Sequence, residues 1–521
     1  MRLTCRVDNF FKIRPLFLYV LVFAIALTLF SYLQFDQTFA DPDSFYHAKM
    51  ARLLAERGVI TEFPWLSATN LKSSFIDHHF LYHLALAPFV KLWPPLIGLK
   101  IAAILFASLA ILAIFWFLRQ LKIKGAFWHA IFLMTVNPFI FRLNLAKAQP
   151  LVLIFLFLTI YLVFSRRYFY LALLSGLYVW LYGGWPLAAV AAGLYALINW
   201  FWQYLPGWPP AILRNWARQK IHKQNFLLLL SAGGGLLAGI FFNPYFPKNL
   251  DFYWQQTFKI ALVNYQSVIG VGGEWYPYGI QDLFAAALPF SLLLLFALAG
   301  FVFFYKKQPA SAWFFFILSF LFFILTLKSR RYVEYFIPLA LCFSALSLNV
   351  FLEALTKNLS KILPPRYVLP LPLFILLAIS PIFARDLMSV KNSYQKGLPF
   401  EKFAEPARWL EQNSQAGDIV FHSDWDEFPL LFYYNDKDYY LAGLDPTFMY
   451  QYNPALYRRW ADYTTGKTRA GLYLTIKNVF KAKYVFVDIK QNQAFDRNLA
   501  DNFNFKKVFE NGEAKIYQLE P

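Results

Sequence analysis

Long apolar stretches separated by short charged segments fill the first three quarters of the chain. A helix of roughly 20 apolar residues can cross a bilayer, and about eleven stretches approach or reach that length. A shorter amphipathic stretch at 80–93 either lies along the interface or extends the second span. We therefore expect a mainly α-helical polytopic membrane protein with about 11–13 transmembrane helices. The expected spans are 15–35, 98–118, 126–141, 151–164, 168–182, 185–204, 226–242, 283–305, 312–327, 332–352 and 368–384.

The charges between the spans indicate which side of the membrane each loop occupies. Basic residues precede the first span and no clear cleavage site follows it, so we expect an uncleaved first helix with a cytoplasmic N-terminus. Alternation then puts the segments 36–96, 142–150, 183–184, 243–282 and 328–331, and everything after Arg385, outside. We expect an inner-membrane location with a periplasmic C-terminal region. Five basic clusters fall inside, as the positive-inside rule requires, namely Arg119/Lys122/Lys124, Arg166/Arg167, 214–223, Lys306/Lys307 and Lys357/Lys361.

A few cations depart from this rule. Lys328, Arg330 and Arg331 fall at the outer face, and Arg142 and Lys147 do so more mildly. Either the helix count is off by one near Lys328, or these cations are kept outside for a reason. We favour the second interpretation, because shifting the count would displace the basic clusters on both sides.

The composition changes near residue 399, where charges become mixed and apolar runs shorten. Strands are predicted at 417–422, 439–442 and 482–488, helices at 405–413, 454–464 and 469–480, and a hairpin around Asn511-Gly512. Such alternation predicts a small α/β domain. The expected organisation is a transmembrane domain over 1–398, with outer loops 36–96 and 243–282, and a soluble extracytoplasmic α/β domain over 399–521.

The composition narrows the function classes. Charged residues make up 15% of the chain, against about 25% in soluble domains, so most of the chain belongs in lipid. The net charge of +19 is explained by cytoplasmic loops facing anionic lipid. Nucleic acid is not expected as a partner, because no basic stripe with interleaved aromatic residues lies outside the membrane. The two cysteines, Cys5 and Cys342, lie at different depths, and no Cys/His spacing typical of metal sites occurs.

The first candidate site is Asp41-Pro42-Asp43, just after the first span. An Asp-x-Asp pair can hold a divalent cation through hard oxygen ligands, or one carboxylate can act as a general base. The alternative is an Asp-Pro turn followed by a helix N-cap at Asp43 or Ser44.

Two further candidates lie in the outer loops. His78 and His79, followed by Tyr82 and His83, either line a phosphate, sugar or metal site or form an interfacial helix whose rings meet lipid headgroups. Glu274 follows two glycines, which give a mobile backbone. It is either a ligand, a group that positions an acceptor, or part of an ordinary exposed turn.

The remaining candidates are a basic turn and a C-terminal loop. Lys328, Arg330 and Arg331 suit the phosphate of a polyprenyl carrier, since arginine presents a fork that fits phosphate oxygens; headgroup snorkelling is the alternative. Asp424-Trp425-Asp426 follows a predicted strand, where open α/β sheets build binding sites. Capping of the next helix by Asp424 is the alternative there.

The order of these motifs resembles the catalytic subunit of oligosaccharyltransferase, in the GT-C superfamily of membrane glycosyltransferases, over nearly the whole chain. The resemblance implies a GT-C-like fold. By position, Asp41 or Asp43 would bind metal and contact the acceptor, and Glu274, in Glu274-Trp-Tyr-Pro277, would bind metal or acceptor. Lys328-Ser-Arg330-Arg331-Tyr332 is similar to the segment with a basic residue near the lipid phosphate.

Two departures limit what the resemblance implies. The family carries a second acidic pair where this chain has a turn with Arg142 and Lys147 and no carboxylate, so Mg²⁺ or Mn²⁺ stays an open expectation and these cations are expected to meet phosphate charge. The family motif Trp-Trp-Asp-Tyr-Gly, which reads the hydroxyl amino acid of the acceptor sequon, is not intact around Asp424, Trp425 and Asp426. An acceptor role is expected for these three residues, without recognition of an Asn sequon.

The function expected from these motifs is transfer of a sugar or oligosaccharide from a polyprenyl phosphate or pyrophosphate carrier to an extracytoplasmic acceptor. Two alternatives stay open. A transporter or flippase for a lipid-linked substrate would need ionisable residues near mid-span and paired repeats. The sequence shows few such ionisable residues and no repeats. A non-catalytic GT-C-like assembly protein would agree with the missing acidic pair. The expected donor-phosphate residues are Arg330, Arg331, Lys328, Arg142, Lys147, His78 and His79, and the expected catalytic and metal residues are Asp41, Asp43 and Glu274.

Overall fold

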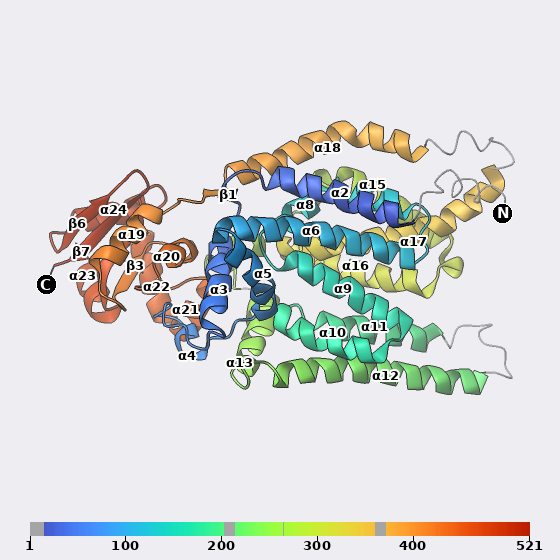
Figure 1. The fold of residues 1–521 in the computed structure, drawn as a ribbon, viewed down its shortest axis with the longest axis horizontal. Coiled ribbons are helices and arrows are strands. Elements are labelled where there is room, and N and C mark those ends of the chain that lie inside the picture. Colours follow the sequence, from blue (N-terminus) through green and yellow to red (C-terminus); the bar gives the residue numbers. More distant parts are fainter. Residues whose placement is uncertain (1–14, 203–213, 264, 360–370, 521) are drawn as a thin grey trace. The chain divides into compact units, whose positions relative to one another are not determined.

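The computed structural model describes residues 15–202, 214–263, 265–359 and 371–520, which fall into two compact units (Figure 1). Unit 1 comprises Met1–Asp36, Ala103–Phe241 and Glu274–Gln395, and unit 2 comprises Gln37–Ala102, Phe242–Gly273 and Lys396–Pro521. The N-terminal basic residues, Cys5 and Lys361 lie outside the described residues.

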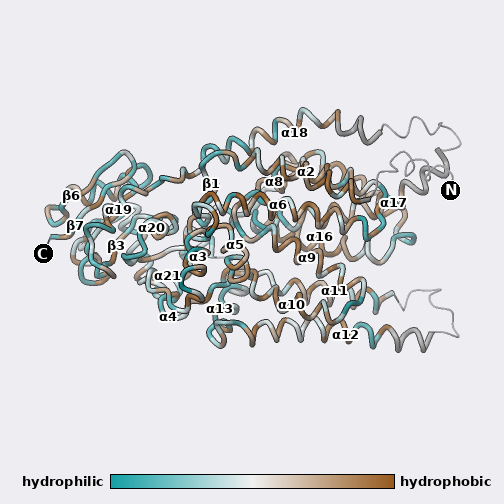
Figure 2. The backbone as a smooth tube through the Cα atoms, in the orientation of Figure 1, coloured by the Kyte–Doolittle hydropathy of each residue, from teal (hydrophilic) through white to brown (hydrophobic). Residues whose placement is uncertain are grey.

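Unit 1 is built from apolar helices, which are brown along most of their length in Figure 2. In the described residues, five helices are long and apolar enough to cross a membrane, or seven if each of two bent pairs is one span. Together with shorter apolar helices, they make the chain a mainly α-helical multi-pass membrane protein, as predicted. The helices are α2 Pro15–Leu33, α6 Pro95–Gln120 (which begins in unit 2), α7 Ala126–Leu133, α8 Asn137–Leu143, α9 Gln149–Ser165, α10 Tyr168–Leu181, α11 Leu187–Trp202, α12 Arg214–Phe241, α14 Ile280–Ala286, α15 Leu288–Phe303, α16 Ala310–Lys328, α17 Val333–Leu359 and α18 Leu371–Gln395.

Two expected spans are bent rather than continuous. The stretch 126–141 is split into α7 and α8 at an angle of 77°, and 283–305 is split into α14 and α15 at 104°. Each second helix carries a proline at its start, Pro138 in α8 and Pro289 in α15. Proline lacks an N–H and disfavours helical geometry in the residue before it, so each break falls just ahead of a proline.

Glycines bring α10 and α12 into close backbone contact. A Cβ atom on Gly235 would lie 2.1 Å from the Ala172 carbonyl oxygen, and one on Gly239 would lie 2.4 Å from that of Gly176. The Trp180 indole also donates to the Gly239 carbonyl at 2.7 Å. Small residues at such an interface are how membrane helices approach closely without a hydrophobic driving force.

Several loops that charge alternation assigns to one face meet at one end of unit 1. The Gln34 amide, at the end of α2, donates to the Asn144 carbonyl after α8. The backbone of 276–278 bonds to that of 326–330, where α16 ends. The loops predicted to share a face therefore do share an end of this unit, which agrees with keeping Lys328–Arg331 there rather than shifting the helix count.

Unit 2 contains a five-stranded sheet in the order β4-β3-β5-β7-β6, with β3 parallel to β4 and β5 and with β7 antiparallel to its neighbours. The structure confirms the predicted strands, the hairpin and the helices at 405–413 and 454–464. In place of the expected helix at 469–480 it has a short α-helix followed by a π-helical turn. The elements are α19 Ala404–Asn413, β3 Ile419–His422, η7 Trp425–Glu427, α20 Phe428–Tyr434, β4 Tyr439–Tyr440, α21 Pro446–Tyr452, α22 Pro454–Thr464, α23 Leu472–Leu474, η8 Thr475–Val479, β5 Ala482–Asp488, α24 Gln493–Ala500, β6 Phe505–Glu510 and β7 Ala514–Leu519.

The first long loop is part of unit 2. Tyr440 in the edge strand β4 donates its N–H to the Trp65 carbonyl at 2.7 Å, and its own carbonyl accepts from the Ser67 N–H at 2.8 Å. Phe63 and Trp65 pack their rings against Phe432 of α20. An edge strand needs a partner for its unpaired backbone groups, and this loop supplies one.

The remaining elements of unit 2 come from both long loops and from the segment before α19. The helix α3 packs against α5 and α20 within this unit, and β1 pairs antiparallel with β2. The elements are β1 Thr38–Phe39, α3 Asp43–Arg57, α4 Leu71–Ser74, α5 Phe80–Leu92, α13 Asn249–Trp254, η2 Gln255–Val263 and β2 Leu398–Pro399. Residues 37–102 and 242–273 thus lie in the same compact unit as residues 396–521, whereas residues 274–282 of the second loop belong to unit 1.

Candidate functional site

Five charged side chains of unit 1 form one network, which we call the ion cluster: Arg142, Lys147, Glu274, Arg331 and Glu334. Arg142 bridges the two carboxylates, with Nη1 2.6 Å from Glu274 Oε2 and Nη2 2.8 Å from Glu334 Oε2. Arg331 Nη1 lies 3.7 Å from Glu274 Oε1, and Lys147 Nζ lies 4.0 Å from Glu274 Oε2. Glu274 therefore faces three cations.

The cluster gathers residues from distant parts of the chain at the ends of helices. The ends of α8 and α16 and the start of α17 converge there, so the backbone that carries the charges belongs to packed elements rather than to a free loop. Arg142 is in the last turn of α8, Lys147 in the turn before α9, Glu274 in η3 (Gly273–Trp275), Arg331 in η5 (Arg330–Tyr332) and Glu334 in the first turn of α17.

Neighbouring groups fix the position of Glu274 and Arg331. The Ser329 hydroxyl donates to the Glu274 backbone carbonyl at 2.8 Å. The Arg331 guanidinium lies 4.1 Å from the centre of the Trp275 ring and donates to the Tyr182 hydroxyl. Arginine over an aromatic face is a favourable arrangement when shielded from water, so Arg331 is held from two sides.

The ion cluster carries an excess of positive charge away from water. It contains three cations and two carboxylates, and the Glu334 side chain is only 1% exposed, that of Arg142 7% and that of Glu274 24%. Burial by itself would raise the pKa of Glu274, but Lys147, Arg142 and Arg331 lower it well below its usual range. Three cations thus meet around one ionised carboxylate in a place shielded from water, an arrangement that suits an anionic ligand.

The other predicted cations of this region lie beside the cluster. The Arg330 Nε donates to the Pro277 carbonyl at 3.1 Å, and its guanidinium stands over the Tyr278 ring. Arg330 is exposed, and Lys328 ends α16. Both therefore stay predictions as donor-phosphate residues, whereas Arg142, Lys147 and Arg331 are brought together.

Two members of this site escaped the sequence analysis, Glu334 and Tyr182. Glu334 had a usable signal, because it is a carboxylate at the start of an otherwise apolar span, and such residues commonly mark functional sites in membrane proteins. Tyr182 gave no such signal, since tyrosine is frequent near membrane interfaces.

The first-loop carboxylates lie in unit 2. The Asp43 backbone N–H donates to Asp41 Oδ1 at 2.8 Å, which forms an Asx turn at the start of α3. The turn foreseen as the alternative is thus present, but the expected N-cap at Asp43 or Ser44 is wrong, because Pro42 precedes α3 and no side chain caps it. A catalytic role for Asp41 or Asp43 stays a prediction.

The expected metal set of Asp41, Asp43 and Glu274 is divided between the two units. Over the described ranges, no group of three or more His, Cys, Asp or Glu side chains is placed to hold a metal ion. Three facing cations make Glu274 a poor ligand for Mg²⁺ or Mn²⁺.

Unit 2 holds a buried hydrogen-bonded chain on α3, α5 and the loop before α5. Asp77 Oδ2 lies 2.6 Å from His83 Nδ1, and His83 Nε2 lies 2.8 Å from His47 Nδ1. Two imidazole nitrogens can share this bond only if one carries a proton and the other does not, so one ring donates and the other accepts. The rings of His78 and His79 lie 3.8 Å apart with their planes inclined by 42°. The backbone N–H of His79 donates to Asp77 Oδ1 at 3.0 Å. The expected phosphate role of His78 and His79 stays a prediction.

The acidic side chains in the loop after β3 cap the helical turn that follows it. Asp424 accepts from the Asp426 N–H at 3.2 Å, while Glu427 Oε2 accepts from the Asp424 N–H at 2.9 Å. Burial raises the pKa of Asp424 and of Glu427. The capping alternative is therefore realised, and an acceptor role for Asp424, Trp425 and Asp426 stays a prediction.

Comparison with known proteins identifies the fold. No protein-family model matches the sequence, and no curated protein matches it either. Among solved structures, the archaeal oligosaccharyltransferase AglB from Archaeoglobus fulgidus, in complex with an inhibitory peptide and a dolichol-phosphate, is 17% identical, with a TM-score of 0.59 over 91% of this chain and 69% of that chain. ArnT from Cupriavidus metallidurans, bound to undecaprenyl phosphate, is 12% identical, with a TM-score of 0.56 over 96% of this chain and 97% of that chain.

A third similar structure is the arabinofuranosyltransferase AftD from mycobacteria, which is 12% identical, with a TM-score of 0.53 over 96% of this chain and 40% of that chain. All three are GT-C glycosyltransferases. At this identity the likeness concerns the fold, and the predicted GT-C fold is thereby confirmed.

Proposed function

We propose that the chain transfers a sugar or oligosaccharide from a polyprenyl phosphate or pyrophosphate carrier to an acceptor on the extracytoplasmic side of an inner membrane. The observation that carries the proposal is the ion cluster, which gathers three cations around Glu274 at the end of apolar helices. The lipid phosphates bound to the structurally similar ArnT and AglB support the same ligand here.

Within the cluster, Arg331 and Lys147 are the cations that bind the carrier phosphate. They lie 3.7 and 4.0 Å from Glu274, whereas Arg142 lies at 2.6 Å and also binds Glu334. The two looser pairs lose the least attraction when a phosphate oxygen becomes a second partner. Arg142 and Glu274 hold these cations in place.

The reaction is a displacement at the anomeric carbon of the donor. The acceptor oxygen forms a bond to this carbon, the bond from the carbon to the phosphate oxygen breaks, and the phosphate leaves with the electron pair. Arg331 and Lys147 stabilise the charge that develops on the leaving phosphate, an electrostatic effect. The acceptor proton passes to a carboxylate, for which we propose Asp41 or Asp43 as general base.

Two arginines, one inside and one outside the ion cluster, give the sharpest test of the phosphate assignment. We expect Arg331→Ala to lower transfer from a polyprenyl-linked donor by about 10²–10³-fold, the usual loss when a preorganised donor to a developing anion is removed. Arg385→Ala, at an exposed arginine of α18 outside the ion cluster, is the control and is expected to stay close to the unmodified protein. Equal effects of the two substitutions would refute the assignment.

The base assignment is tested separately. Asp41→Ala and Asp43→Ala are assayed for transfer with the same donor and for binding of the carrier phosphate. We expect one of them to lose about 10²-fold or more in transfer while both still bind the lipid. Full transfer by both variants would remove these carboxylates from the mechanism.

A further inference from the structure

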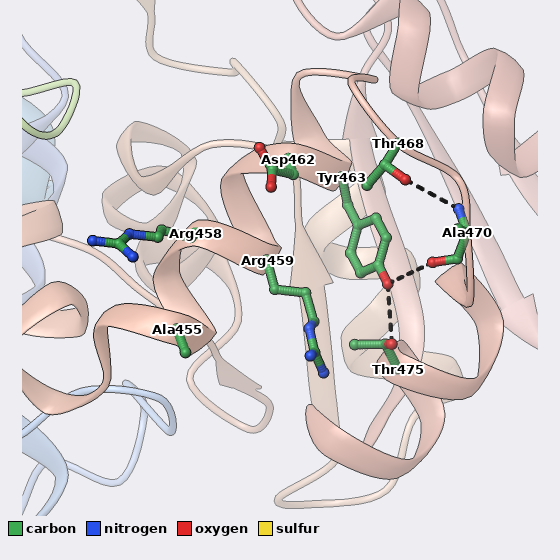
Figure 3. Close-up of a pocket in the computed structure, with 8 residues that line it drawn as sticks. All are labelled: Ala455, Arg458, Arg459, Asp462, Tyr463, Thr468, Ala470 and Thr475. Atoms are coloured by element: carbon green, nitrogen blue, oxygen red, sulfur yellow. Dashed lines mark hydrogen bonds between the residues drawn. The ribbon is translucent and has the colours of Figure 1, made fainter.

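Unit 2 contains a pocket of about 520 Å³ between α22 and the residues 468–475 (Figure 3). This volume lies in the range of roughly 300–1,000 Å³ typical of small-molecule sites. Most of its lining side chains are polar or charged, and they include Arg458, Arg459, Asp462, Tyr463, Thr468 and Thr475. None of the functions considered so far uses it.

The wall opposite α22 is held in a fixed shape. The Tyr463 hydroxyl donates to the Ala470 carbonyl at 3.0 Å and lies 3.0 Å from Thr475 Oγ1. Two glycines with left-handed backbones, Gly466 (φ +73°) and Gly471 (φ +66°), shape the connecting loop, and a Cβ on Gly466 would lie 2.4 Å from the Ala494 Cβ. The pocket is therefore preformed, which lowers the entropic cost of binding.

The charge at the pocket is positive. Arg458 and Arg459 are exposed on α22, and within the described part of the chain neither forms an ion pair with a carboxylate. Asp462, the acidic residue of the lining, is paired with Lys467 at 3.1 Å. In Figure 3 the Arg459 side chain reaches down beside Tyr463 and Thr475, whereas Arg458 points away from them.

We propose that this pocket binds the anionic group of an acidic saccharide, a carboxylate or phosphate substituent on a sugar. The guanidinium fork of Arg459 matches an oxyanion in two parallel hydrogen bonds, and the hydroxyls of Thr468 and Thr475 suit sugar hydroxyls. Tyr463, the aromatic residue of the lining, is buried, so no exposed ring face stacks a nucleobase. The further step that this saccharide is the acceptor rests on the proposed transferase function.

Binding is measured on the full chain in detergent, without any donor lipid, using a labelled uronic-acid oligosaccharide and its neutral counterpart. The acidic probe is expected to bind at least tenfold more tightly than the neutral one, and more weakly as salt rises. Arg459→Ala should weaken binding of the acidic probe about tenfold or more, and Arg458→Ala less. Arg497→Ala, at an exposed arginine on α24, is the control and should change nothing.

Three outcomes overturn the inference: equal binding of acidic and neutral probes, unchanged binding by Arg459→Ala, and displacement of the probe by inorganic phosphate as readily as by the unlabelled saccharide. The last would reduce the pocket to a general oxyanion site. The pocket inference and the proposed function can fail separately. A chain that binds the probe but catalyses no transfer refutes only the proposed function. A chain that transfers to a neutral acceptor but binds no probe refutes only the pocket inference.

Discussion

Glu274 in unit 1 and Glu427 in unit 2 are both shielded carboxylates, yet their surroundings shift their pKa values in opposite directions. Burial raises the pKa in each case, but three cations lower that of Glu274 well below the usual range. Glu427 receives hydrogen bonds from Ser423 and the Asp424 backbone, and His422 and these bonds only partly offset its burial. Burial alone therefore does not decide whether a carboxylate is charged. The difference between Glu274 and Glu427 comes from the cations that face Glu274.

The same contrast separates the roles of the two regions. In unit 1, two carboxylates hold three cations together, which is the basis of the proposed phosphate site. In unit 2, the carboxylates after β3 satisfy backbone N–H groups of the next turn and so stabilise the fold locally. The partners of an acidic motif therefore decide whether a catalytic role follows from it.

The largest effect is expected from removing the residue that joins both carboxylates of the ion cluster. Arg142→Ala leaves Glu334 buried without its ion-pair partner, and breaking one side of a buried pair costs about 3–5 kcal/mol. Thermal unfolding in detergent measures the loss, with Arg330→Ala as an exposed control. A loss below about 0.5 kcal/mol, as for ordinary surface positions, would show that the cluster is not a stabilising network.

Glu274→Gln is expected to destabilise the protein by about 1–3 kcal/mol at neutral pH, because hydrogen bonds to a charged group are lost. The folded pKa of Glu274 lies below the unfolded value, so its stabilisation is complete above about pH 4.3 and disappears as the pH falls through the lower folded pKa. The stability difference between Glu274→Gln and the unmodified protein should therefore shrink only in strong acid. A difference that is constant with pH would contradict the charged state of Glu274.

For Glu427→Gln we expect a pH dependence of stability with the opposite sign, and a smaller change in the free energy of unfolding, on the order of 1 kcal/mol. Since the folded pKa of Glu427 is raised, the folded protein binds a proton there before the unfolded chain does. Stability of the unmodified protein therefore rises as the pH falls through this raised pKa towards about 4.3, and the variant lacks that rise. Unfolding midpoints measured at closely spaced pH values between neutral and mildly acidic conditions give the comparison, and an equal rise in both proteins would count against it.

The smallest effect is expected from removing divalent cations. Glu274 faces three cations, so carrier-phosphate binding at the ion cluster should change less than twofold on treatment with EDTA, roughly the precision of such measurements. Lipid binding lost with EDTA and restored by Mg²⁺ would show that a metal takes part after all. Parallel transfer assays with Mg²⁺ and Mn²⁺ test the ion still expected at Asp41 and Asp43.

The sequence predicted the local structure well and the long-range contacts poorly. Apolar runs and β-branched strands report on their own surroundings, so the helices and the sheet strands were found, and Arg142, Lys147, Glu274 and Arg331 were each recognised as unusual. Their mutual contacts were not, because Arg142 and Glu334 are separated by 192 residues. Nor did the pattern reveal that the first loop completes the edge of β4, since a backbone pairing leaves no trace in hydropathy.

That pairing also imposes an order in time. Ser67 and Tyr440, which bond across the edge of β4, are separated by 373 residues, and ribosomes add about 5–20 residues per second. The first loop therefore waits on the order of tens of seconds before its partner strand exists. During that interval the rings of Phe63 and Trp65 lack the α20 surface that later covers them. A truncated chain that ends before β4 would leave this loop as an exposed apolar segment, accessible to quality-control proteases.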